Sequence, residues 1–155
     1  MWYKGKMVLS VASYNFLRWH KNARVVTAFL LDFILCYLLT DKAVQFAVER
    51  DTTMQIFEAF IWTFGDSNAI LLVSLLLLIL FADMPFITTA TPFYLMRTTR
   101  RVWVVGQMVY VALATMLFMV FTLFSTVVLT MQNAFAGNRW SRTAAALAYS
   151  GSGKE

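Results

Sequence analysis

Few residues in this chain carry the kind of side chain that catalysis or metal binding requires. The sequence has one histidine, His20, and one cysteine, Cys36. A disulfide framework and a Cys/His metal cluster are therefore not expected. We find no serine, histidine and aspartate set and no pair of carboxyl groups that suggests acid–base work. The sequence predicts no enzyme activity and no cofactor.

The C-terminal tail resembles a phosphate-binding loop only in part. Residues 151–155 read Gly-Ser-Gly-Lys-Glu. A phosphate-binding loop also needs a glycine where this chain has Ala148 and a hydroxyl residue where it has Glu155. We therefore expect no nucleotide site in this chain, and any ATP would be bound by another protein.

Asp32 is the one acidic residue that lies deep within a long apolar segment. A charged side chain at the centre of a bilayer costs about 2.5–3.5 kcal/mol on insertion scales, so such residues are candidates for function. Three roles stay open for this intramembrane polar residue. It could be protonated or face a wet groove, it could pair with a Lys or Arg of a partner, or it could take a direct part in transport.

The elements around Asp32 are those of a membrane protein. The chain has 155 residues, of which 60% are hydrophobic and 14% are charged, whereas soluble domains average about 25% charged residues. A span requires about 20 mostly apolar residues in a helix. Three segments meet this requirement, at about 23–42, 68–86 and 102–131. We therefore predict an all-α, polytopic membrane protein with a single transmembrane domain, residues 1–155.

Shorter segments accompany these three spans. Residues 9–22 mix aromatic, basic and apolar side chains and are predicted to form an interfacial helix. Residues 56–64 are aromatic but too short to span and contain Glu58, which favours an interfacial or re-entrant segment over a fourth span. The tail, 132–155, is less apolar and shows the start of another helix at about Thr143.

The formal net charge of +5 is distributed unevenly over the segments between the spans. Basic residues concentrate before the first span and in the loop 87–101. This distribution predicts that both lie in the cytoplasm, facing anionic lipid rather than nucleic acid. The N-terminus would then be cytoplasmic and the tail extracytoplasmic, in a multi-pass protein of the cell membrane.

The cytoplasmic loop 87–101 is predicted to contain a short surface helix. Thr91 is a suitable N-cap and Pro92 fits the first helical position. Apolar side chains and then basic side chains follow it, which suits either docking in the groove of a soluble partner or anchoring to lipid headgroups. The residues that would contact such a partner are Pro92, Phe93, Tyr94, Arg97, Arg100 and Arg101.

The sequence resembles a bacterial family along residues 14–110. One stretch reads Asp83-x-Pro85-Phe86, followed by Pro92-Phe93-Tyr94-Leu95-x-Arg97-Thr98-x-Arg100-x-x-Trp103-x-x-Gly106-Gln107-x-x-Tyr110. The approach to the first span, Tyr14-Asn15-Phe16-Leu17-Arg18-Trp19, is similar as well. Both resemble the permease subunits of ABC-2-type ABC transporters. Such permeases usually have more spans than the three predicted here, so the chain looks like one N-terminal half.

This resemblance implies a function and partners. A permease of this family binds no ATP and works with a separate cytoplasmic ATPase, which its coupling helix contacts; here that helix would be 92–101. A second permease copy or half would complete the pathway, and the transported substrate cannot be read from the residues. The alternative is a non-transporting integral membrane protein, such as an assembly, sensor or immunity-type subunit.

Overall fold

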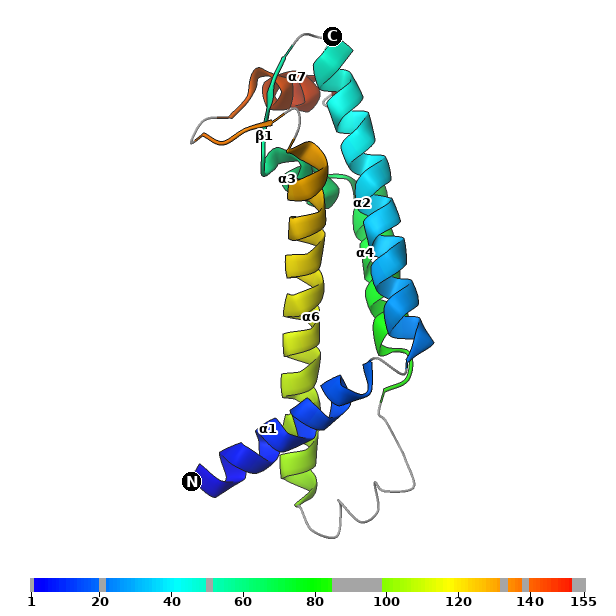
Figure 1. Cartoon of the computed structure of the whole chain (residues 1–155), viewed down its shortest axis with the longest axis vertical. Coiled ribbons are helices and arrows are strands. Elements are labelled where there is room, and N and C mark those ends of the chain that lie inside the picture. The colour runs from blue at the N-terminus through cyan, green and yellow to red at the C-terminus, as the bar shows by residue number, and fades with distance from the viewer. Residues whose placement is uncertain are drawn as a thin grey trace. The chain divides into compact units, whose positions relative to one another are not determined.

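The chain is mostly helical, in agreement with the sequence-based prediction. The computed structural model describes residues 2–19, 22–49, 52–84, 99–131, 134–137 and 140–151. Figure 1 shows the helices and the two short strands. In chain order they are α1 (Trp2–Leu17), α2 (Ala23–Glu49), β1 (Met54–Gln55), α3 (Glu58–Gly65), α4 (Ser67–Phe81), α6 (Arg100–Thr130), β2 (Ala134–Phe135) and α7 (Arg142–Gly151).

Two helices, α2 and α6, are long and apolar enough to cross a membrane. They contain 27 and 31 residues and correspond to the predicted spans at 23–42 and 102–131. α2 continues beyond the predicted end because no Gly or Pro stops it before Glu49. The side-chain amide of Gln45 also donates to the Asp41 carboxyl one turn earlier, at 2.9 Å.

The predicted span at 68–86 corresponds to a shorter helix. α4 has 15 residues and rises about 22 Å at 1.5 Å per residue, less than the ~30 Å hydrocarbon core. It follows α3 at an angle of 88°, so the pair forms either a bent third span or a re-entrant segment. The break lies at Asp66, whose extended backbone ends α3 and whose Oδ1 accepts the Asn68 N–H at 3.1 Å.

The terminal elements differ in part from the prediction. α1 begins and ends earlier than the predicted helix at 9–22, whereas α7 begins next to the predicted Thr143.

β1 and β2 were not predicted. They pair in parallel, with Met54 opposite Ala134, and are too short to show the alternation that reveals strands in a sequence.

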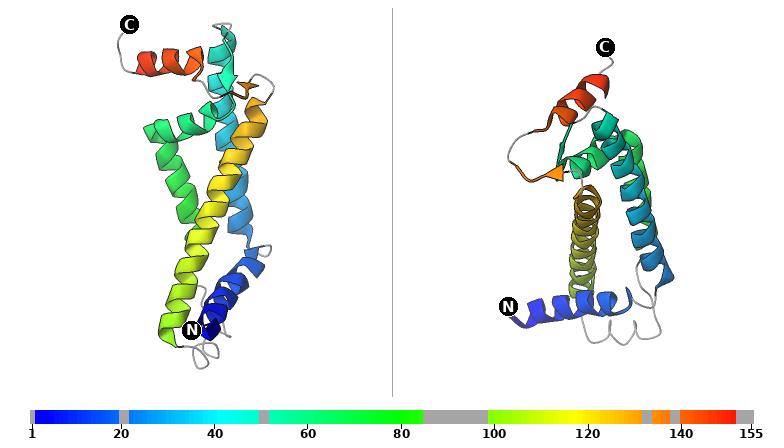
Figure 2. Two further views of the ribbon diagram at one scale, coloured as in Figure 1. Left: turned by 90° about the vertical axis from the view of Figure 1, so that its left-hand side faces the viewer. Right: turned by 45° about the horizontal axis from the view of Figure 1, so that its top comes forward.

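The contacts divide the chain into two compact units, and α2, α4 and α6 contribute to both. The first unit contains Met1–Phe29 and Leu75–Met119, and the second contains Leu30–Ser74 and Val120–Glu155. In the first unit α1 runs across the beginning of α6 (Figure 1). In the second unit β1 lies against β2, α3 and α7 (Figure 2).

Candidate functional site

In the first unit, polar side chains attach the N-terminal segment to α6. Asn15 Nδ2 donates to Gln107 Oε1 at 2.9 Å, and Trp19 Nε1 donates to the Tyr110 hydroxyl at 2.8 Å. Asn15 and Tyr110 are both buried. α1 is therefore fixed to another helix of the chain through part of the surface that was predicted to lie against lipid headgroups.

A glycine in α6 allows α1 to approach closely. A Cβ atom added to Gly106 would lie 2.8 Å from Cβ and Cγ1 of Val11, and 3.3 Å from the carbonyl oxygen of Val8. Such distances are shorter than carbon–carbon packing allows. One turn of α6 beyond this contact, the Tyr110 ring lies edge-on to Phe16 at a centroid distance of 5.0 Å. Gly106 thus permits a helix contact that aromatic packing then extends.

Asp83, just after α4, is bound to the beginning of α2. Its Oδ2 accepts the Asn22 side-chain amide at 3.0 Å, and its Oδ1 forms an ion pair with Arg24. Asn22 also accepts the backbone N–H of Arg24 at 3.0 Å through its Oδ1, the bond that an N-cap residue forms. The Asn22 side chain thereby caps α2 and links it to Asp83, which lies shortly before the loop predicted to be cytoplasmic.

Most of the predicted coupling helix lies outside the described residues. The residues that are not described include Pro92, Phe93, Tyr94 and Arg97 of this helix. His20, elsewhere in the chain, is not described either. Arg100 and Arg101 are described, as the first two residues of α6, and both are exposed. These two guanidinium groups are accessible to a partner protein or to lipid phosphates.

The second unit contains Asp32 in a buried polar position between α2 and α6. Its side chain is 0% exposed, and its Oδ2 accepts the Thr122 hydroxyl at 3.0 Å. The Asp32 Oδ1, Thr40 Oγ1 and Ser125 Oγ atoms are buried and have no hydrogen-bond partner among the described residues. A Lys or Arg of a partner could reach Asp32 only after the helices of this unit separate, so packing within the chain is its observed role.

A second buried carboxyl group, that of Glu58, connects α3 to α7. Its Oε1 accepts the Ser141 N–H at 2.7 Å, and its Oε2 accepts the Ser141 hydroxyl at 2.5 Å and the Gln55 N–H at 3.1 Å. Ser141 Oγ in turn accepts the Ala144 N–H at 3.1 Å, which caps α7. These contacts were not predicted, although Ser141 directly before a helical segment is a recognisable N-cap signal.

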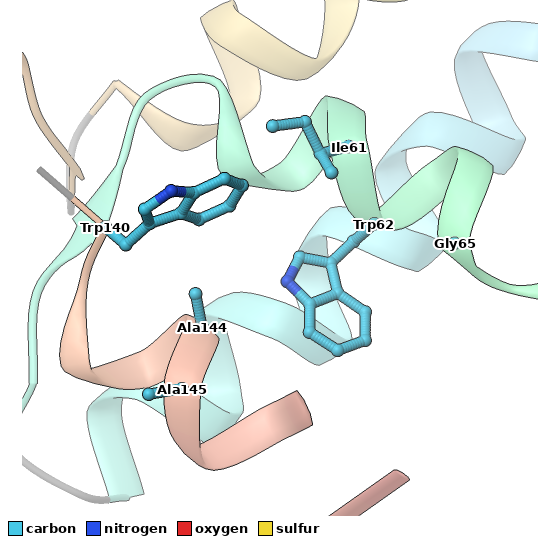
Figure 3. A pocket seen from close by; sticks show the side chains of 6 residues that line it. All are labelled: Ile61, Trp62, Gly65, Trp140, Ala144 and Ala145. Atoms are coloured by element: carbon cyan, nitrogen blue, oxygen red, sulfur yellow. The ribbon is translucent and has the colours of Figure 1, made fainter. Parts of the chain in front are cut away.

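An apolar groove opens beside this connection, between α3 and α7. It has a volume of about 550 Å³ and is lined by Ile61, Trp62, Gly65, Trp140, Ala144 and Ala145. Figure 3 shows the indole rings of Trp62, from α3, and of Trp140, just before α7, as the two largest side chains of this lining. Within the described ranges, we find no group of three or more His, Cys, Asp or Glu side chains that could hold a metal ion.

Comparisons of the chain with protein-family models, with curated proteins and with solved structures found no significant match. The function is therefore inferred from the residues and contacts described above.

Proposed function

We propose that the chain is a membrane-spanning permease subunit of an ATP-driven transporter, or the N-terminal half of one. It would cross the cell membrane three times, with α4 as the short second span and the N-terminus in the cytoplasm. A separate cytoplasmic ATPase would bind the segment 92–101, and a second permease copy or half would complete the transport pathway.

One observation supports this proposal most directly. Several residues on which the family resemblance rests are also those that join the N-terminal segment to the rest of the first unit. Trp19 binds Tyr110, and Asn15 binds Gln107. Asp83 pairs with Arg24, just inside α2. These residues thus share the structural role of joining the N-terminal segment to the helices on both sides of the loop, and this shared role is what supports the proposal.

These contacts also suggest how movement of the loop would reach the spans. Asp83 lies just before the loop, and Gln107 lies in the first two turns of the helix after it. Both are hydrogen-bonded to residues 15–24, which lead into α2. A displacement of the segment 92–101 by an ATPase would therefore pull on α2, α4 and α6 together.

The test is co-purification of the ATPase from native membranes in mild detergent. We expect stoichiometric recovery of a soluble ATPase with the tagged chain, and its loss in the double variant Arg97→Glu with Arg101→Glu. The charge-matched control is Arg139→Glu with Arg142→Glu, in the predicted extracytoplasmic tail, which should recover the ATPase normally. Membrane insertion of both variants is checked by extraction with alkaline carbonate.

Two results would reject the proposal. If no ATPase is recovered under conditions where a known ABC complex survives, the chain is a non-transporting membrane protein. If the Arg97→Glu and Arg101→Glu variant recovers the ATPase as well as the unmodified chain, the coupling assignment of the segment 92–101 fails.

A further inference from the structure

The groove between α3 and α7 lies where the membrane-spanning part of α6 ends. Thr130, the last residue of α6, donates its hydroxyl to the carbonyl oxygen of Ile56 at 3.4 Å. α3 begins two residues after Ile56, and its axis is turned by 88° from that of α4. With α4 inserted along the membrane normal, α3 would run along the membrane surface. The groove is therefore expected at the boundary between hydrocarbon and headgroups.

The lining of the groove is suited to this depth. Its side chains are all apolar apart from the indole N–H groups of Trp62 and Trp140. Indole rings concentrate at membrane–water interfaces because they combine a large apolar surface with one polar donor. Trp140 is 69% exposed despite its size, so the chain itself does not cover this ring.

The groove is held open by polar contacts outside it. Glu58, at the start of α3, binds both the backbone and the hydroxyl of Ser141, just before α7. Thr143 adds a hydrogen bond to Thr52, at 2.7 Å between the two hydroxyl oxygens. The spacing of the two walls therefore does not depend on a bound ligand.

Gly65 lines the groove at the end of α3 and leaves space around its backbone. Exposed apolar side chains lie before and after this glycine, at Ile61 in α3 and at Ile70 and Leu71 in α4. The exposed polar residues 66–68 lie between Gly65 and the apolar side chains of α4. The groove therefore has both apolar and polar neighbours, as expected for a site at the edge of the hydrocarbon.

We propose that this groove binds an acyl chain of a phospholipid from the leaflet that faces α7. An acyl chain has no hydrogen-bonding groups to satisfy, whereas the backbone of a bound peptide would lose its bonds to water without finding partners in this lining. The headgroup would remain in water at the level of the two indole rings. This inference requires membrane insertion of the chain but not the transporter assignment.

The experiment uses a phosphatidylcholine with a photoreactive diazirine in its acyl chain. It is added in near-equimolar amount to the full chain purified in detergent, and the labelled residues are mapped by mass spectrometry. We expect saturable labelling of residues 61–65 and 140–145, which excess unlabelled phosphatidylcholine suppresses. The label should be several-fold weaker in Gly65→Leu, because the new side chain occupies the groove.

Two further variants make the result interpretable. Gly5→Leu is the matched control, because a Cβ at Gly5 or at Gly65 meets no atom within 4 Å, and it should label as the unmodified chain does. Trp140→Ala is the second test variant, for use if Gly65→Leu does not fold. It removes one wall of the groove, changes a largely exposed side chain, and should also weaken the label. Equal labelling in all variants, or label spread without saturation over α2 and α6, would overturn the proposal.

Discussion

Two buried carboxyl groups differ in the number of hydrogen bonds that they accept. Glu58 accepts three, from the backbone of Gln55 and from the backbone and hydroxyl of Ser141. Asp32 accepts one, from Thr122, and its other oxygen has no partner among the described residues. Because a buried polar atom is costly without a partner, the contacts of Glu58 stabilise its position more completely than those of Asp32.

The contact between Asp32 and Thr122 is expected to stabilise the helix pair only slightly. In a double-mutant cycle of Asp32→Ala and Thr122→Val, we expect a coupling of about 0.6 kcal/mol and at most ~1.7 kcal/mol, the range for side-chain hydrogen bonds in membranes. The measurement is reversible unfolding in mixed detergent. Ser125→Ala is the control, because its hydroxyl has no partner in the described part of the chain, and it should not destabilise. A coupling of zero would show that this hydrogen bond does not persist in solution.

Replacement of Glu58 by Gln is expected to loosen α7. One carboxyl oxygen becomes an amide group that faces a donor, and an unsatisfied buried donor costs about 1–3 kcal/mol. Hydrogen exchange of the α7 amides should become faster by the factor that corresponds to this loss of free energy. Glu49→Gln, at the exposed end of α2, is the charge-matched control. Unchanged exchange in Glu58→Gln would mean that other contacts hold α7.

At the scale of elements, close helix contact depends on where small residues lie. Gly106 is the position at which α1 and α6 meet too closely for any larger side chain. Ala12, Tyr110 and Ala114 form a buried cluster around the same contact, with Phe16 and Trp19 packed against it. α1 thus holds the beginning of α6, in addition to the interfacial position predicted for it.

Gly106→Ala and Gly5→Ala should have opposite effects. Alanine favours a helix over glycine by about 1 kcal/mol, and Gly5 has open space, so Gly5→Ala should not destabilise the protein. In Gly106→Ala this gain is outweighed by overpacking against Val11, which costs about 1–3 kcal/mol. Thermal unfolding in detergent and hydrogen exchange of α1 would measure both. Equal stability of the two variants would show that α1 does not pack against α6 in solution.

The topology of the whole molecule depends on which helices cross the bilayer. α2 and α6 qualify by length and apolar composition, and α3 with α4 qualifies only as a bent pair. Cys36 is the one cysteine in the sequence and is buried. A cysteine-free background is therefore available through the conservative change Cys36→Ala, which allows labelling of single introduced cysteines.

Single cysteines before and after the apolar part of α6, at Arg101 in α6 and at Arg142 in α7, should label from opposite sides. In the Cys36→Ala background, we expect Arg142→Cys to react with an impermeant maleimide in intact cells. Arg101→Cys should react only after permeabilisation, because basic residues near spans favour the cytoplasm. Both native side chains are exposed, so access of the reagent is not limited by packing. Labelling of both positions from the same side would exclude α6 as a span.

The sequence alone determined the class of this protein and the position of its longest helices. Backbone groups in hydrocarbon must be satisfied within the segment itself, so an apolar run of sufficient length predicts a helix without knowledge of its neighbours. The beginning of α4 could be predicted for a similar reason, since the Asp66 carboxyl satisfies an N–H only two residues away.

Which polar residues meet could not be predicted from the sequence. Asn15 and Gln107 are 92 positions apart, and Glu58 and Ser141 are 83 apart. No pattern within one segment indicates such pairs, because they depend on how the helices pack. The same reason explains why the β1–β2 pair and the groove at Trp62 and Trp140 were not predicted: each is formed by segments that are distant in the chain and uninformative when read separately.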